Sequence, residues 1–451
     1  MKSQIKNESL QSVNLLIVLC AIFIIGSVTF VVIEYYASII MILLIICICI
    51  FIDLEQMFFV LSFCLPIADI LKLSLNSITV LPFIYLIFFV KLFFRNTHFG
   101  ESKLIAFLVL TFIAILNALL RNAGLNYSVS FLFNIFFAIF VGQYFYKNAT
   151  KNFFNNVAIY FSLALALSII LVLIFPEIRN KVGHVDFGNR LNALCGDPNS
   201  LTQDILIACG LLLFVLFSLP KKSKLICLIL LVFLLISGFF TYSKSYALTL
   251  ILMVGWAFID VCVKLRKKNS KYFYVFLIFI LCIAITSLIF VYLFVIRPIF
   301  DERSGSDFFT GRLEIWSGYL KLIFSDVYVF IFGCGIRNAI NYVNEFDVIA
   351  VAHNTYLELI SENGFLGVIV IIYLMWIPLY NALRARNLFN FYSLAMISFL
   401  ITSFGISINA ADTIYWIFVL YHVNINTSIT FRKGDYLKNE ISLYNKKYIS
   451  V

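Results

Sequence analysis

The sequence predicts an all-α, polytopic integral membrane protein with about 12–14 transmembrane helices and a large extracytoplasmic loop carrying short helices. Hydrophobic residues make up 63% of its 451 residues and charged residues 12%, and the mean hydropathy is +1.01. These values lie outside the range of soluble globular domains. Apolar runs also recur at the length, about 20 residues, that crosses a hydrocarbon core. Because backbone polar groups in lipid must bond within their own segment, the runs are expected to be helices.

Hydropathy predicts about fourteen spans along the chain. They lie near residues 13–33, 37–52, 56–70, 77–94, 102–120, 129–147, 154–175, 201–219, 224–240, 243–263, 272–296, 355–378, 389–406 and 410–425. The first is long enough to cross and lacks a small-residue cleavage site, so it is expected to stay as a membrane helix. The third is the weakest, because Pro66 and Asp69 interrupt it.

Basic residues in the short connections predict the orientation, because Lys and Arg are retained on the cytoplasmic side. The basic connections are separated from one another by two spans and contain Lys91, Arg95, Lys103, Lys147, Lys151, Lys221, Lys222, Lys224, Lys264, Arg266, Lys267, Lys268, Lys271, Arg384 and Arg386. Both termini are therefore expected in the cytoplasm. Without the third span the N-terminus would lie outside, against the preference of Lys2 and Lys6. Residues 1–451 are expected to form a single transmembrane domain with two longer extracytoplasmic loops, 176–200 and 297–352.

Composition and spacing argue against two classes of partner. The formal net charge is +10, but the excess lies in predicted cytoplasmic connections, where topology and anionic headgroups account for it, so nucleic-acid binding is not expected. No Cys/His spacing resembles a metal site, and we expect neither a metal nor a cofactor. Cys195 and Cys334 lie in the two outer loops and could form a disulfide or remain free thiols.

Three predicted helices begin at the outer face with polar residues. Ser200 and Gln203 have capping-box spacing, as do Thr355 and Glu358, and a run of hydroxyls precedes the span at 243. Helix N-termini present free N–H groups and partial positive charge, which suits a phosphate or diphosphate. Four cations could complete such a site, because their side chains pair with phosphate oxygens: Arg190, Lys244, Arg303 and Arg312.

A purely structural interpretation of these residues stays open. Most helices of any polytopic protein are capped by Ser, Thr, Asp or Asn. Lys244 could extend its long side chain to the membrane interface, and Arg303 and Arg312 could pair with the acids of their own loop. Gly364 and Gly367 permit close helix packing or local bending, and the interpretation as packing positions is preferred.

The order of motifs resembles a known family. His353-Asn354 is followed after nine residues by Gly364, and after two more by Gly367. Gly333-Cys334-Gly335 and Arg312 with Trp316 precede this segment. Together these residues resemble the signature of the O-antigen ligase and O-antigen polymerase family of bacterial envelope enzymes. Upstream, Arg190 followed by Asp197-Pro198-Asn199 resembles that family's arginine and Asp-Pro-Asn segment. Tyr242-Ser243-Lys244-Ser245 resembles its Ser-Arg segment, with Lys244 in the arginine position. The resemblance covers roughly residues 185–370.

This resemblance implies glycan transfer without a metal, from an undecaprenyl-diphosphate-linked oligosaccharide, at the periplasmic or extracellular face of a bacterial cytoplasmic (inner) membrane. Two reactions use the architecture: repeat-unit polymerisation for O-antigen or capsule, and ligation of the chain to lipid A core in lipopolysaccharide biosynthesis. The Phe, Ile, Lys and Asn bias favours the polymerase. Chain-length regulator proteins, flippase proteins and membrane lipids are the candidate partners.

Residue roles follow from this chemistry. The acceptor hydroxyl loses a proton as it attacks, and His353 has the intrinsic pKa of a general base, with Asn354 orienting it or a sugar. Arg312 and Arg303 are the first candidates for the diphosphate, because charge develops on that leaving group. Further substrate-binding candidates are Arg190, Lys244 and Asn199. Glu358 and Glu362, four residues apart on one helix face, are left outside the catalytic set.

A lipid-linked oligosaccharide flippase or another transporter is the alternative of a different class, since it would also be all-helical. Such proteins carry ionisable groups at mid-membrane depth and paired broken helices in two related halves. The sequence shows no such internal repeat by eye, and Asp204 and Asp260 lie near the ends of their spans. A structural scaffold is a third possibility, and it predicts that replacing His353 or Arg312 leaves surface glycan unchanged.

Overall fold

The computed structural model describes residues 2–74, 78–95, 101–150, 152–182, 190–218, 221–267, 312–346, 348, 350–384, 391–405, 413 and 415–420. Over these ranges the chain is helical and contains no β-strand apart from an isolated bridge between Lys72 and Thr79. The predicted all-α fold is confirmed. The predicted span at 272–296, Arg303, and most of the predicted span at 410–425 lie outside the described residues.

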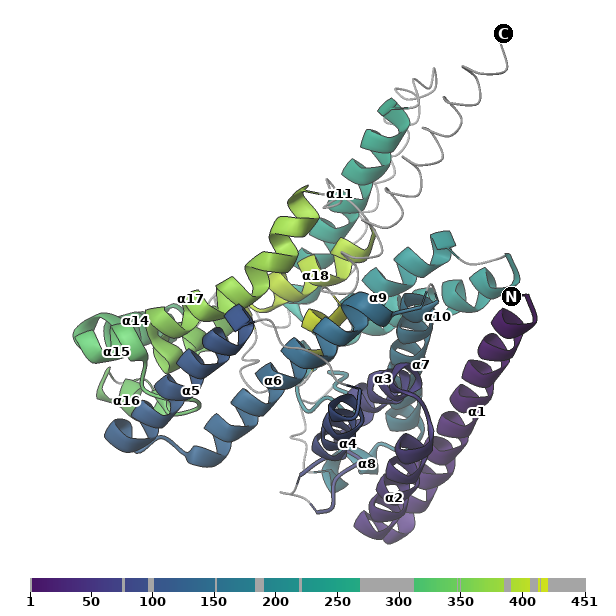
Figure 1. The fold of residues 1–451 in the computed structure, drawn as a ribbon, viewed down its shortest axis with the longest axis horizontal. Helices are drawn as coiled ribbons and strands as arrows, with labels where there is room; N and C mark the ends of the chain where they lie inside the picture. The colour runs from purple at the N-terminus through teal and green to yellow at the C-terminus, as the bar shows by residue number, and fades with distance from the viewer. Residues whose placement is uncertain are drawn as a thin grey trace.

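The helices follow the predicted spans closely (Figure 1). In the first half they are α1 Lys2–Ile33, α2 Tyr35–Phe51, α3 Leu54–Cys64, η1 Leu65–Ile67, α4 Leu81–Phe93, α5 Glu101–Arg121, α6 Leu125–Asn148, α7 Phe153–Ile174 and the short α8 Glu177–Lys181. In the second half they are α9 Pro198–Ser218, α10 Lys221–Phe239, α11 Lys244–Lys267, α14 Arg312–Ser325, α15 Val327–Phe332, α16 Ala339–Val343, η3 Asn344–Phe346, α17 Thr355–Arg384 and α18 Phe391–Thr402. Within the described part, six helices are long and apolar enough to cross a membrane, and five shorter ones are apolar.

The weak third span is short and packs against α2 and α4. At one end of α2, the Ser38 hydroxyl donates to the carbonyl of Ile70, which follows η1, at 2.6 Å. At the other end, the Lys91 ammonium of α4 donates to the Cys49 carbonyl at 2.8 Å. Within α3, every residue except Glu55 and Gln56 is buried. Other helices therefore surround this segment, which explains why it can be short and interrupted by Pro66.

Contacts between connections agree with the predicted alternation of faces. Tyr35 donates to the carbonyl of Lys181 at 2.8 Å, and the Lys181 ammonium pairs with Glu34 at 3.2 Å, which joins two connections predicted outside. Arg95 donates to Tyr144 at 3.0 Å, near two connections predicted inside. These contacts fit the predicted alternation of the connections between the two faces. The assignment of either face to the cell exterior stays a prediction.

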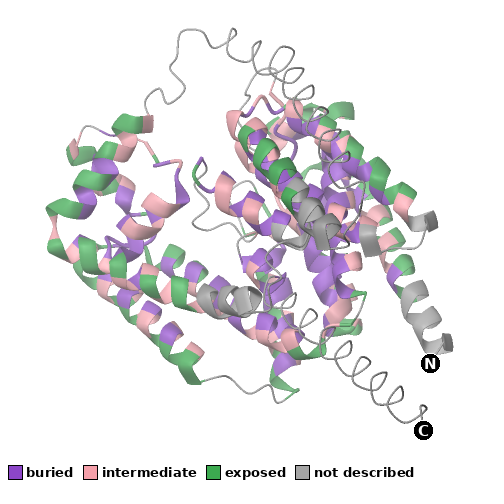
Figure 2. Ribbon diagram, turned by 90° about the horizontal axis from the view of Figure 1, so that it is seen from above, coloured by how far each residue is buried: buried purple, intermediate pink, exposed green. Residues whose placement is uncertain are grey.

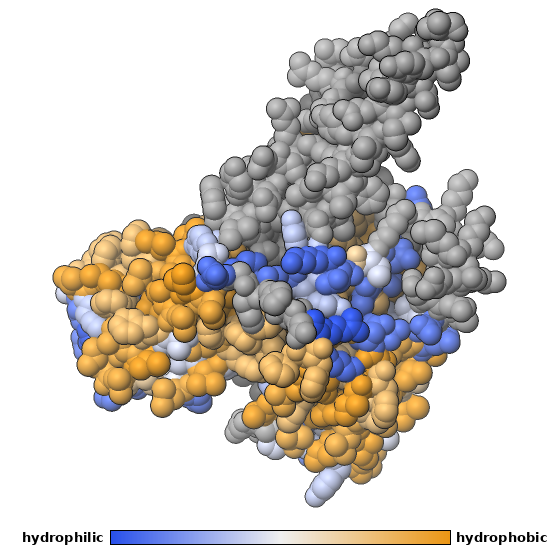
Figure 3. Space-filling model, in the orientation of Figure 1, coloured by the Kyte–Doolittle hydropathy of each residue, from blue (hydrophilic) through white to orange (hydrophobic). Residues whose placement is uncertain are grey.

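The buried residues form two cores. The larger runs through α1–α4, α6, α7, α9–α11 and α18, and the smaller lies in the predicted outer loop among α14–α16 (Figure 2). Large apolar side chains also cover the surface, for example Ile17 and Ile25 of α1, which are 61% and 65% exposed. Figure 3 shows hydrophobic residues over large areas of the surface, with a hydrophilic band beside them. A lipid-facing surface is the physical reason for such exposure.

Helix α17 is broken at Gly364, where φ is 65° and ψ is 177°. The break leaves two carbonyls without helical partners, and the segment after α15 satisfies them. The Cys334 N–H donates to the Ser361 carbonyl, and the Gly335 N–H donates to the Glu362 carbonyl, both at 2.9 Å. Gly364 supplies the local bend, because its positive φ ends the first part of the helix. It is also a packing position, since a Cβ there would overlap the Ile331 carbonyl. Gly367 lies within a helical turn against Asn363, as a packing position would.

We expect Gly364→Ala to destabilise the protein by about 2 kcal/mol or more, because an alanine at positive φ is strained and its Cβ would overlap the Ile331 carbonyl. The measurement is the thermal unfolding midpoint of purified protein in detergent. Gly255→Ala is the matched control: no atom lies within 4 Å of a Cβ at that helical position. An unchanged midpoint for Gly364→Ala would show that the break does not require glycine.

Candidate functional site

The start of α9 is formed by Asp197 and Pro198, which lie before the predicted cap. The Asp197 carboxylate accepts a hydrogen bond from the Asn199 N–H at 2.6 Å, and Pro198 occupies the first helical position. The predicted pairing of Ser200 with Gln203 as a capping box is wrong, because the Gln203 amide donates instead to the Thr402 hydroxyl at 2.7 Å. Proline favours the first helical turn since its missing N–H would have no partner there.

The start of α17 is capped by Asn354 rather than by Thr355 with Glu358. The Asn354 side-chain oxygen accepts from the N–H groups of Tyr356 at 3.0 Å and Leu357 at 3.3 Å. The Thr355 N–H donates to the Ser403 carbonyl at 2.9 Å, which fixes this start against the end of α18. Asn354 therefore uses its oxygen for the helix, and its amide nitrogen is the group that it can offer to a substrate.

The start of α11 contacts the start of α9. The Ser243 hydroxyl donates to the Asn199 side-chain oxygen at 2.8 Å and lies 2.7 Å from the Ser245 hydroxyl. Arg190, half-buried, donates through Nε to the Thr241 carbonyl at 2.9 Å. Three of the predicted segments, around Arg190, Asn199 and Lys244, thus meet at one end of the bundle.

Arg312 begins α14 and lies beside the start of α11. An ideal Cβ at Gly405, just after α18, would be 3.5 Å from Arg312 Nη1 and 3.8 Å from the Ser245 Cβ. One turn further along α14, the Trp316 indole donates to the Ala352 carbonyl at 2.9 Å. This bond ties the helix that carries Arg312 to the residue immediately before His353.

His353 adopts a left-handed backbone conformation, with φ of 48°, at the entry to α17. Burial lowers the pKa of its imidazole, the positive charge of Arg312 lowers it further, and the carboxylate of Asp197 acts in the opposite direction. Arg312 and Asp197 therefore both lie within electrostatic range of His353. The imidazole is neutral at neutral pH, which is the form that accepts a proton.

The structure thus brings together the candidates that it describes: His353, Asn354, Arg312, Arg190, Asn199 and the segment with Lys244. Arg303 lies outside the described residues. Sequence reasoning left two participants out of the site. Asp197 lies in the Asp-Pro-Asn segment that the resemblance singled out but was given no role, although it precedes proline as a helix cap would. No sequence signal marks the end of α18 at Ser403 and Gly405.

The acids and thiols near the site are buried or hydrogen-bonded. Glu358 and Glu362 are each only 4% exposed. Cys195 and Cys334 are both free: the Cys195 thiol donates to Asp204 at 3.5 Å, and the Cys334 thiol donates to the Ser361 carbonyl at 3.1 Å. Over the described ranges, no group of three or more His, Cys, Asp or Glu side chains could hold a metal ion.

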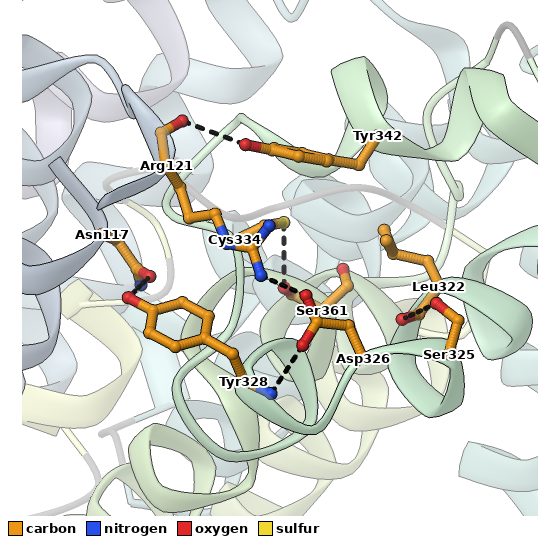
Figure 4. Close-up of polar contacts among 9 residues, drawn as sticks. All are labelled: Asn117, Arg121, Leu322, Ser325, Asp326, Tyr328, Cys334, Tyr342 and Ser361. Carbon is orange, nitrogen blue, oxygen red and sulfur yellow. Dashed lines mark hydrogen bonds and ion pairs between the residues drawn. The ribbon is translucent and has the colours of Figure 1, made fainter. Parts of the chain in front are cut away.

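Arg121, at the end of α5, anchors the predicted outer loop (Figure 4). Its guanidinium pairs with Asp326 and lies 4.7 Å from the centre of the Tyr328 ring. Its carbonyl accepts from the Tyr342 hydroxyl at 3.2 Å, and the Asn117 amide donates to the Phe332 carbonyl at 2.9 Å. These bonds hold α14–α16 on α5 and so contribute to the position of Arg312, at the start of α14.

Comparison with known protein families finds a match in this chain. Residues 229–372 match a family model described as O-antigen ligase. The matched part includes Lys244, Arg312, His353 and Asn354, whereas Arg190 and Asn199 precede it. No curated protein matches the chain. The match over residues 229–372 confirms the resemblance of this membrane protein to the O-antigen ligase and O-antigen polymerase family.

Proposed function

We propose that this protein is a polysaccharide repeat-unit polymerase of the bacterial cytoplasmic membrane. It transfers a glycan from an undecaprenyl-diphosphate-linked donor to a sugar hydroxyl of another lipid-linked unit, at the outer face. The observation that carries the proposal is the meeting of a neutral imidazole, His353, with the Arg312 guanidinium where α9, α11, α14 and α17 all begin. The O-antigen ligase domain supports the same class of reaction.

The arrangement fits the bond changes of glycan transfer. His353 accepts the proton of the acceptor hydroxyl as that oxygen attacks the anomeric carbon of the donor. The bond between this carbon and the diphosphate oxygen breaks, and undecaprenyl diphosphate leaves. Arg312 and the free N–H groups of the helix starts stabilise the negative charge that grows on the leaving group. These groups supply the positive charge, so the proposed reaction needs no metal ion.

Ligation to lipid A core is the second candidate, because the same site would serve a different acceptor. The compositional bias of the chain supports the polymerase over the ligase. A flippase is less well supported, since the O-antigen ligase domain and the grouping of His353 with Arg312 are features of a transferase site rather than of a transport pathway.

Deleting the gene and separating surface polysaccharide on a gel tests the proposal. A polymerase predicts chains shortened to one repeat unit, restored by the wild-type copy. Full-length chains stranded on the lipid carrier would identify a ligase instead. Lipid-linked units that accumulate in the cytoplasmic leaflet would identify a flippase and overturn the proposal.

A further inference from the structure

A polar cavity of about 330 Å³ lies at the opposite end of the bundle from the candidate site. It is lined by residues of α1, the start of α3, the end of α4, and the α6–α7 connection with the residues beside it. The ring of Phe154, at the start of α7, packs 6.1 Å from that of Phe214, near the end of α9. Since the candidate site surrounds the start of α9, the cavity is separated from it by the length of that helix.

Three charged side chains line the cavity, and bonds to neighbours hold them in place. Arg95 donates to the Tyr144 hydroxyl at 3.0 Å. Asp53 accepts from the Gln56 N–H at 2.8 Å, and Glu55 accepts from the Thr150 N–H at 3.2 Å. A guanidinium has five N–H donors and a carboxylate about four acceptor positions. Glu55 also accepts from the Thr150 hydroxyl, so a ligand would bind to these groups in addition to their present partners.

The charges select the class of ligand. Asp53 and Glu55 disfavour a simple anion, while Arg95 disfavours a simple cation. A ligand that carries one phosphate and one ammonium group satisfies both signs. The phosphate accepts from the guanidinium, and the ammonium donates to the carboxylates.

Apolar residues beside the cavity indicate that this ligand is a lipid. Phe93 and Phe94 directly precede Arg95 and are 80% and 79% exposed. On α1, Val13 follows the residues that line the cavity and is 52% exposed. A polar cavity that adjoins exposed apolar side chains matches the boundary between a headgroup and its acyl chains.

We propose that this cavity binds the headgroup of a zwitterionic phospholipid with a primary ammonium group, such as phosphatidylethanolamine. The phosphate lies at Arg95, the ammonium at Asp53 and Glu55, and the acyl chains run along Phe93 and Phe94. This site is independent of the proposed glycan transfer.

The experiment is native mass spectrometry of the full-length protein, exchanged into detergent with equal amounts of phosphatidylethanolamine, phosphatidylcholine and phosphatidylglycerol. We expect preferential retention of phosphatidylethanolamine. Arg95→Gln and Glu55→Gln should each lower its retention about tenfold, because each removes a charge-assisted bond. Arg95→Lys should retain most of the binding, which separates loss of charge from loss of folding. Lys147→Gln is the matched control, since Lys147 is an exposed cation at the same end of the bundle outside the cavity.

Two outcomes would overturn the proposal. Equal retention of the three lipids, or unchanged retention by both Arg95→Gln and Glu55→Gln, would exclude headgroup recognition by these residues. Binding of soluble phosphoethanolamine as tightly as the lipid would identify a free phosphate ester as the occupant. Weak competition by phosphoethanolamine, at concentrations far above those of the lipid, is the result expected if acyl chains contribute.

Discussion

Replacing His353 with alanine is expected to lower glycan transfer by about 10²–10⁴-fold, the usual contribution of a general base. The imidazole is half-buried and neutral at neutral pH, since burial and Arg312 both lower its pKa. Alanine cannot accept the proton of the acceptor hydroxyl. The measurement is the length of surface polysaccharide in a deletion strain that carries the variant, together with transfer by purified protein.

A second variant separates this chemistry from backbone strain. His353 has a φ of 48°, a conformation that asparagine adopts more readily than alanine. His353→Asn should therefore keep the unfolding midpoint of the wild type and still lose transfer. His98→Ala, in a predicted cytoplasmic connection, should retain full activity. Full restoration of long chains by His353→Asn would remove His353 from the mechanism.

Arg312→Gln is expected to lower the maximal rate by about 10²–10³-fold and also to change its pH dependence. The rate of a base-catalysed step falls as pH drops through the pKa of the base. In the wild type this acid limb lies below the ordinary histidine value of about 6.5, because burial and Arg312 lower the pKa of His353. Without the positive charge of Arg312 that pKa rises, so the limb moves to higher pH.

The two effects are measured together in a pH series of initial rates with purified protein. Arg337→Gln is the matched control, because Arg337 is exposed in the same outer loop and stacks on Tyr127 at 5.0 Å. It should leave both the rate and the acid limb unchanged. If the rate of Arg312→Gln fell at the same pH as that of the wild type, or at a lower pH, the electrostatic coupling of Arg312 to His353 would be contradicted.

Much of the fold could be predicted because a helix that crosses lipid needs about 20 consecutive apolar residues. The expected span at 154–175 is α7, Phe153–Ile174, and that at 129–147 is α6, Leu125–Asn148. The prediction was weakest for the third span. All residues of α3 except Glu55 and Gln56 are buried, so neither its length nor its composition had to match a helix that faces lipid.

The candidate site could be predicted by residue type but not by its detailed bonds. A histidine before a predicted helix start and the arginines of the outer loop pointed to His353 and Arg312, and the structure places them together. The caps differ from those expected: Asn354 replaces Thr355, and Asp197 replaces Ser200. Capping depends on where the chain leaves the helix, and several neighbouring polar residues compete for that position.

The sequence by itself determined the membrane class, the helical fold and the residues able to carry the chemistry, because hydropathy and side-chain type are properties of consecutive residues. Only the tertiary structure decided which helix starts meet, that Gly364 breaks α17, and that Arg121 anchors the outer loop. These features depend on contacts between distant segments, as between Asn117 and Phe332. Such contacts arise from packing and from the pairing of buried polar groups, and a local sequence pattern does not encode them.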